Sequence, residues 1–140
     1  MTLHPVLIAG QWRQARSGAS FSAENPALGE RLPDEYPISD WADCEDALAA
    51  ADAAAAELRA QSPEKRAVFL EAFAARIEAR KDELVEMAHA ETGLPKAPRL
   101  ADVELPRTTG QLRQGALAAR EGSWALPTID TKLNIRSVLA

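Results

Sequence analysis

The helical character of this chain is set by the stretch WADCEDALAAADAAAAELRA, residues 41–60, in which half of the residues are alanine. Alanine has the highest helix propensity of all amino acids, so the stretch predicts one long helix from about Trp41 to Ala60. Either Asp40 or Asp43 is expected to cap its start, where acidic residues also suit the helix dipole. Its larger side chains recur every three or four residues and predict one apolar stripe: Trp41, Cys44, Leu48, Ala51, Ala55 and Leu58.

Two further helices are predicted directly after this one. Ser62 and Pro63 start the second, with the serine as N-cap and the proline at the first helical position. The third runs from about Lys81 to Glu91, and Gly93 follows it where a terminating glycine is favoured. The faces expected to be buried are Phe69, Leu70, Phe73 and Ile77 on the second helix and Leu84, Met87 and Ala88 on the third.

A fourth helix is predicted from about Arg99 to Arg120. A proline inside a helix removes one hydrogen bond and crowds the preceding turn, so a kink or a break is expected at Pro106. Gly115 is expected to allow close packing, and Gly122 to end the helix. One face after the proline contains Leu105, Thr108, Leu112, Gly115 and Ala119.

Both ends of the chain have the character of strands. Residues 6–9 and 11–13 predict a hairpin turning at Gly10. Residues 21–25 predict an extended segment, after which residues 26–30 close a further hairpin. In the tail, strands are predicted at 124–126, 128–129 and 135–139. The segment is thus expected to be mainly α-helical, with N-terminal β-hairpins and C-terminal strands. Because the sequence ends on an apolar strand, we expect it to have been cut from a longer protein.

The composition argues against several classes of protein. A length of 140 residues allows one domain. The 21 acidic residues outnumber the 16 basic ones and no basic stripe occurs, so nucleic acid is not expected as a partner. No apolar run is long enough to cross a bilayer, and membranes are not expected as partners either. The single cysteine excludes an internal disulfide and suits a reducing compartment, which predicts a cytoplasmic protein.

Few residues carry a recognisable chemistry. Cys44 falls on the apolar stripe of its helix and is interpreted as a packing residue rather than a nucleophile. His4 and His89 lie far apart with no cysteine or histidine at ligand spacing, so no metal site is expected. No glycine-rich phosphate-binding motif occurs. The carboxylate pairs are interpreted as solvated helix faces: Glu83 with Glu86, and Asp102 with Glu104.

One polar pair invites a functional interpretation. Arg107 and Gln111 are four residues apart, so they lie on the same face of the predicted helix. A guanidinium with an amide beside it is well suited to bind a carboxylate. Spacing alone also fits, and indeed favours, an arginine that faces solvent or forms a structural salt bridge.

Read in order, the motifs resemble the N-terminal part of the aldehyde dehydrogenase superfamily. The matching stretches are IAGQW at 8–12, ENPALGE at 24–30, SPEKR at 62–66, ARKDEL at 79–84 and ETGLP at 91–95. Leu28 and Leu94 depart from the threonine and lysine usual in that family. The stretches RTTGQLR at 107–113 and GSW at 122–124, with Ile129 and Asp130, are similar to a narrower group. This group contains NADP-preferring enzymes of the 2,5-dioxopentanoate (α-ketoglutarate semialdehyde) dehydrogenase type.

The resemblance implies an α/β parent fold and the NAD(P)-dependent oxidation of an aldehyde to a carboxylate. The narrower group implies a dioxo-acid semialdehyde as that aldehyde. It implies that residues 1–121 form part of the cofactor-binding domain and that 122–140 begin the oligomerisation strands. In the family, the catalytic residues and the cofactor-binding turn lie beyond the segment matched here. No catalytic, cofactor-binding or metal-binding residue is therefore assigned, and the 140-residue segment alone is expected to be inactive and to bind no NADP. Arg107 is the best candidate for steering a substrate carboxylate, with Gln111 second.

Two alternatives for the whole protein remain open. The chain is either the N-terminal fragment of an aldehyde dehydrogenase or a free-standing, non-catalytic helical module of the same lineage that serves binding or oligomerisation. The expected partners are accordingly the rest of a parent chain or a homo-oligomer, together with a small aldehyde in the parent enzyme. An independent enzyme built around Cys44 or His89 has no supporting constellation.

Overall fold

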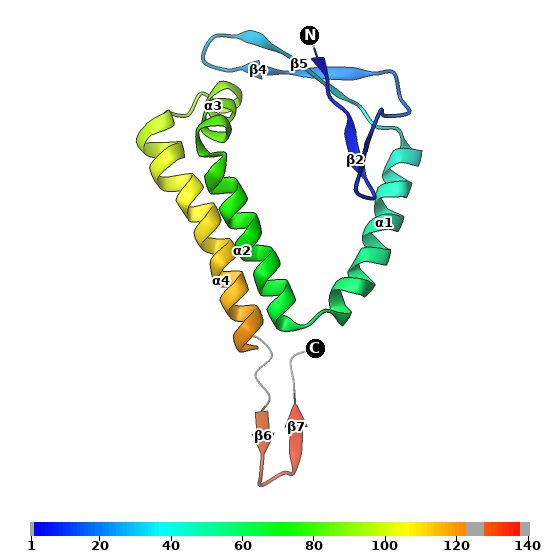
Figure 1. Ribbon diagram of the computed structural model, residues 1–140, viewed down its shortest axis with the longest axis vertical. Helices are drawn as coiled ribbons and strands as arrows, with labels where there is room; N and C mark the ends of the chain where they lie inside the picture. The colour runs from blue at the N-terminus through cyan, green and yellow to red at the C-terminus, as the bar shows by residue number, and fades with distance from the viewer. Residues whose placement is uncertain (1, 123–127, 138–140) are drawn as a thin grey trace.

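The computed structural model describes residues 2–122 and 128–137 of the chain, in which strands come first, helices follow and a pair of strands ends the chain (Figure 1). The mainly helical segment with strands at both ends is confirmed. None of the helices in the described ranges combines the length and the apolar character that a membrane span needs. The elements are β1 (Thr2–Leu3), β2 (Val6–Ile8), β3 (Gln11–Arg13), β4 (Ser20–Asn25), β5 (Glu30–Pro37), α1 (Trp41–Ala60), α2 (Pro63–Ala79), α3 (Lys81–Thr92), η1 (Lys96–Glu104), α4 (Leu105–Glu121), β6 (Thr128–Asp130) and β7 (Ile135–Ser137).

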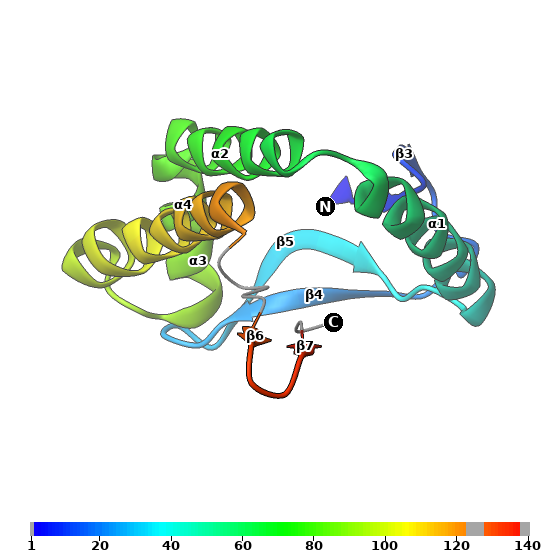
Figure 2. The same cartoon turned by 90° about the horizontal axis from the view of Figure 1, so that it is seen from below.

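The N-terminal strands form two small sheets. β2 and β3 pair antiparallel around Ala9 and Gly10, which both have positive φ as a tight two-residue hairpin turn requires. β4 and β5 form a longer antiparallel ribbon, and β1 joins β5 in parallel. This ribbon extends from α3 at one end to α1 at the other in both views (Figures 1 and 2), so it connects the two helical parts of the molecule.

Local capping fixes where the first two long helices begin. The Asp40 carboxylate accepts a hydrogen bond from the backbone N–H of Asp43 at 2.9 Å, which identifies Asp40 as the cap of α1. Ser62 caps α2 in the same way, accepting from the N–H of Lys65 at 3.3 Å. The two helices diverge from the turn that joins them (Figure 1). The long stripe of α1 is therefore not covered by α2.

Asp43 has a different role from the capping role that the sequence allowed it. Its side chain is buried and accepts a hydrogen bond from the backbone N–H of Arg16 at 2.9 Å. Nη2 of Arg13 lies 2.7 Å from its other oxygen. The hydrogen bond from Arg16 and the Arg13 guanidinium together lower the pKa of Asp43 against the opposing effect of burial. This carboxylate therefore fastens the β2–β3 hairpin to the first turn of α1.

The best-packed part of the molecule is the seam between α2 and α4. The residues buried there are small: Ala67 and Ala74 on α2, and Thr109 and Ala116 on α4. Gly115 faces Leu70, and a Cβ added at this glycine would lie 3.4 Å from Leu70 Cδ1. The close packing expected at Gly115 is therefore confirmed.

The expected burial of Phe69 and Phe73 on α2 is wrong. These side chains are 62% and 49% exposed, and their rings stack on each other with centroids 6.3 Å apart. Two helices approach most closely where their side chains are smallest, so the alanine face of α2 turns toward α4. The two phenylalanines consequently lie on a neighbouring face of α2 that α4 does not cover.

Three other predicted apolar faces also differ from the structure. α3 buries Val85, whereas Leu84 and Met87 are exposed. On α4 the buried face is shifted by one position, with Thr109 rather than Thr108 in the seam. Along α1 the stripe is uncovered, because Trp41, Leu48 and Leu58 are all exposed and Cys44 is half-buried. Periodicity identifies an apolar face, but burial requires a partner segment. Among the described residues no segment covers the stripe of α1.

The fourth predicted helix consists of two segments. η1 is π-helical, with the N–H of Leu105 bonded to the carbonyl of Leu100, and α4 continues from it as an ordinary α-helix. The non-helical backbone in this region lies at Ala97 and not at Pro106. The change from π-helical to α-helical geometry at Glu104 and Leu105 lies directly before Pro106. The chain remains helical through it instead of breaking.

The described tail forms an antiparallel hairpin of β6 and β7. The Asp130 carboxylate accepts the backbone N–H groups of Lys132 and Leu133 at 2.9 and 3.0 Å and closes its turn. The predicted strands at 128–129 and 135–137 are confirmed. The strand predicted at 124–126, and the end of the strand at 138–139, lie outside the described residues.

Candidate functional site

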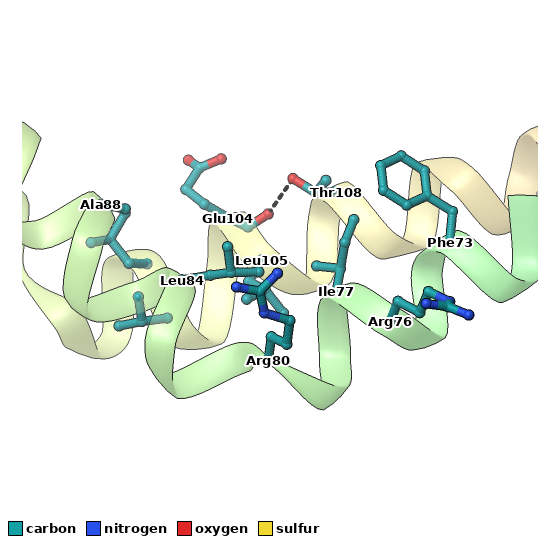
Figure 3. Close-up of a pocket in the computed structure, with 11 residues that line it drawn as sticks. Phe73, Arg76, Ile77, Arg80, Leu84, Ala88, Glu104, Leu105 and Thr108 are labelled. Carbon is teal, nitrogen blue, oxygen red and sulfur yellow. Dashed lines mark hydrogen bonds between the residues drawn. The ribbon is translucent and has the colours of Figure 1, made fainter. Parts of the chain in front are cut away.

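An open groove of about 610 Å³ lies where the end of α2, α3, η1 and the start of α4 meet (Figure 3). Its apolar lining includes Ile77, Leu84, Leu100 and Leu105. Its polar lining consists of Arg76, Arg80, Glu104 and Thr108. An apolar groove with a few polar groups is the usual form of a small-molecule or peptide site.

Glu104 contacts residues of both η1 and α4. One carboxylate oxygen lies 2.6 Å from Nη2 of Arg99, and the other lies 3.9 Å from Nη1 of Arg107. The Thr108 hydroxyl donates a hydrogen bond to the backbone carbonyl of Glu104 at 2.9 Å, as the dashed line in Figure 3 shows. The groove is therefore joined to the candidate residue Arg107 through one carboxylate.

Arg107 does not line the groove but stands beside it on α4. Its side chain is 66% exposed, and its 3.9 Å separation from the Glu104 carboxylate is too long for a hydrogen bond. Gln111 is also exposed, one turn further along the same helix. The guanidinium and the amide therefore remain accessible to a ligand, on the face that their spacing predicts.

Arg113, two residues after Gln111, is by contrast fully engaged. Its guanidinium donates two hydrogen bonds to the Glu78 carboxylate on α2, at 2.7 and 2.8 Å. This forked pair lowers the pKa of Glu78 to about 2. Arg120, near the end of α4, binds Glu64 and Glu71 in the same manner. These ion pairs across the α2–α4 seam were missed from the sequence, because pairing them requires the register of the two helices.

The two histidines and the carboxylate pairs considered from the sequence make contacts within the fold. The ring of His4 stacks on Tyr36 with centroids 5.0 Å apart, and Nδ1 of His89 lies 2.7 Å from the carbonyl oxygen of Leu94. In the ranges that the structure describes, no three metal-ligating side chains come together. The carboxylates of the predicted solvated faces form ion pairs: Glu83 with Arg80, Glu86 with Lys96, Asp102 with Lys81, and Glu104 with Arg99.

The sequence and the structure of the chain were compared with those of known proteins. The model of the aldehyde dehydrogenase family matches residues 12–135. The chain is 39% identical over 140 residues to alpha-ketoglutaric semialdehyde dehydrogenase 2 of Azospirillum brasilense, covering 99% of this chain and 26% of that protein. Its structure is similar to that of lactaldehyde dehydrogenase from Escherichia coli, with a TM-score of 0.81 and 28% identity over 93% of this chain and 26% of that one.

A further solved structure shares the fold. It is an aldehyde dehydrogenase of Mycobacterium tuberculosis complexed with NAD+, with a TM-score of 0.80 and 24% identity over 98% of this chain and 28% of that one. The sequence thus spans about a quarter of the length of the relatives that it matches. The predicted α/β parent fold is confirmed by these likenesses. On the match of the family model and the identity to the Azospirillum protein, the chain belongs to the aldehyde dehydrogenase family.

Proposed function

We propose that this chain is the N-terminal part of an NAD(P)-dependent dehydrogenase that oxidises an aldehyde bearing a distal carboxylate, such as α-ketoglutarate semialdehyde. The observation that carries the proposal is Arg107, an accessible guanidinium with no hydrogen-bonded carboxylate among the described residues. The identity of 39% to a protein named for that semialdehyde supports the substrate class.

Arg107 and Gln111 bind and orient the substrate in this proposal. The fork of a guanidinium donates hydrogen bonds to both oxygens of a carboxylate, and a neighbouring amide can donate one more. Fixing the distal end of a semialdehyde restricts where its aldehyde carbon lies, which is how a remote contact contributes to reaction at the other end of the substrate. NAD(P), when bound, accepts the hydride. The chain has no glycine-rich phosphate-binding motif, so we assign none of its residues to the cofactor.

The proposal extends to the organisation of the parent protein. Residues 1–121 form part of the cofactor-binding domain, and 122–140 begin the strands through which subunits associate. The packing of α2 against α4 and the separate β6–β7 hairpin support this division (Figure 1). We further propose NADP as the preferred cofactor, a homo-oligomer as the assembly and the cytoplasm as the location.

The test uses the native polypeptide that contains this sequence, purified from its source. Its intact mass is measured first, and NAD+ and NADP+ reduction are then followed with α-ketoglutarate semialdehyde and with pentanal, a neutral aldehyde of the same carbon number. We expect a polypeptide several times heavier than 15.1 kDa and a higher kcat/KM for the semialdehyde. A heavier polypeptide that reduces neither cofactor with either aldehyde contradicts the proposed activity. Equal kcat/KM values for both aldehydes contradict the substrate class.

A free-standing oligomerisation module is the second candidate, favoured by one observation. Large apolar side chains along one stripe of α1, among them Trp41, Leu48 and Leu58, are exposed, and an exposed apolar helix face is typical of an interaction surface. A native mass of 15.1 kDa together with self-association in sedimentation would support this module instead of the dehydrogenase.

A further inference from the structure

Two arginines compete for the single carboxylate of Glu104. Arg99, in η1, is in ion-pair contact with it, with Nη2 to Oε1 at 2.6 Å. Arg107, in α4, approaches the other oxygen only to 3.9 Å. The side chain of Glu104 is 30% exposed, whereas those of both arginines are more than half exposed. The carboxylate therefore pairs with Arg99, and the guanidinium of Arg107 remains accessible to a ligand.

We infer that Arg99 is a positioning residue that keeps Arg107 available for the carboxylate of the substrate. It does so by neutralising Glu104, which would otherwise bind Arg107 itself. The inference rests on the proposed function, in which Arg107 binds a carboxylate-bearing aldehyde. It deepens that function by naming the residue that determines how strongly the enzyme prefers such an aldehyde over a neutral one.

The backbone geometry explains why Arg99 is placed to do this. Arg99 precedes Glu104 by five residues. On an α-helix this spacing would place the two side chains about 140° apart around the helix axis, on different faces. After Ala97, whose backbone is non-helical, η1 is π-helical, with the N–H of Leu105 bonded to the carbonyl of Leu100. In this geometry residues five apart lie closer to one face than they do on an α-helix, and the guanidinium reaches the carboxylate. The π-helical turn before Pro106 thus creates the ion pair.

The competition itself follows from helix spacing. Arg107 is three residues after Glu104, and oppositely charged residues at this spacing meet on the helix surface. With Arg99 absent, Glu104 would have Arg107 as its nearest cation. An internal carboxylate acts at a high effective concentration, so a substrate carboxylate would have to displace it. Removal of Arg99 is therefore expected to weaken binding of the carboxylate-bearing substrate specifically.

The test is steady-state kinetics of the native holoenzyme with α-ketoglutarate semialdehyde and pentanal. The measured quantity is the ratio of the two kcat/KM values. Arg99→Gln is expected to lower the ratio by about three- to fivefold, the scale of one partly exposed ion pair, through a higher KM for the semialdehyde. Arg99→Lys is expected to restore part of the ratio, and the double change Arg99→Gln with Glu104→Gln to restore most of it. Arg59→Gln, on the exposed end of α1, serves as the matched control.

The outcomes separate this inference from the proposed function. If Arg107→Ala leaves the ratio unchanged, the proposed role of Arg107 fails and the inference fails with it. If Arg107→Ala lowers the ratio but Arg99→Gln does not, or if the second change at Glu104 does not rescue it, the inference is overturned while the role of Arg107 stands. Thermal unfolding of each variant identifies any loss of folding, and a variant that does not fold is replaced by Arg99→Lys with and without Glu104→Gln. A failure of the added Glu104→Gln to raise the ratio in that background also overturns the inference.

Discussion

Nη2 of Arg13 lies 2.7 Å from Oδ1 of Asp43, and the side chain of Asp43 is only 1% exposed. The N–H of Arg16 donates to the second oxygen of the same carboxylate. Three parts of the chain thus meet at one buried charge: the end of β3, the loop after it and the first turn of α1. A buried carboxylate is tolerated when it is both hydrogen-bonded and paired, and it then becomes costly to alter.

Asp43→Asn is therefore expected to lower the unfolding temperature by several degrees. The reason is that the neutral amide at this buried position no longer forms an ion pair with Arg13. Asp46→Asn is the matched control, since Asp46 contacts the same arginines but its side chain is 45% exposed. Its effect should be small. Thermal unfolding by circular dichroism measures both, and hydrogen exchange of the β2–β3 amides shows whether the hairpin is released. Equal effects for the two variants contradict an anchoring role for the buried carboxylate.

Ala74→Leu is expected to destabilise the protein by about 1–3 kcal/mol, because the α2–α4 seam has no room for a larger side chain at that position. Ala75→Leu makes the same chemical change on the adjacent, exposed position of α2 and should alter stability little. Urea unfolding gives both free energies. A similar loss for Ala75→Leu would show that the helix, and not the seam, responds to the change.

Stability should fall in acid partly through Glu78. The Arg113 guanidinium holds the pKa of Glu78 at about 2, below the value of about 4.3 for an unperturbed glutamate. A pKa that is lower in the folded state stabilises the protein above the unfolded pKa, and this contribution is lost as the pH falls toward 2. The unfolding temperature of Glu78→Gln should therefore fall less steeply than that of the unaltered protein between about pH 5 and pH 2.

Added salt provides the internal control for this prediction. Both side chains of the Glu78–Arg113 pair are partly exposed, so salt should screen their attraction and bring the two pH profiles closer together. Parallel profiles at low salt would show that the ion pair does not contribute to the acid sensitivity.

Arg107→Ala is expected to raise the KM for α-ketoglutarate semialdehyde about tenfold or more in the native enzyme, because a charge-assisted, forked contact is lost. Arg107→Lys should recover only part of this, since an ammonium keeps the charge but not the fork. Gln111→Ala should have a smaller effect in the same direction, as one neutral hydrogen bond is lost. Steady-state kinetics with the semialdehyde and with pentanal measures all three. A KM that rises equally for both aldehydes would exclude recognition of the carboxylate.

Much of the local structure could be read from the sequence. The bounds of α1, the caps at Asp40 and Ser62 and the left-handed glycine after α3 all depend on hydrogen bonds between residues at most four apart. The change from π-helical to α-helical geometry directly before Pro106 has a local origin as well, because a proline lacks its own N–H. The family could also be recognised, since its short motifs occur in order along the chain.

The candidate site could be predicted only in part from the sequence. Helix spacing correctly puts Arg107 and Gln111 on one exposed face, and their binding of a substrate remains a prediction. The pairing of Glu104 with Arg99 was not found, because at a separation of five residues it depends on a π-helical turn that no residue pattern in the sequence specifies.

The sequence by itself determined the helices and most of the strands, whereas β1 and the extent of β5 were not predicted. Only the tertiary structure decided which faces are buried and which charges meet. On α2 the largest apolar side chains, Phe69 and Phe73, remain exposed while Ala67 and Ala74 form the seam with α4. The physical reason is that capping and turn formation involve neighbours along the chain, whereas burial depends on how closely two distant backbones can approach, and here the smallest side chains permit the closest approach.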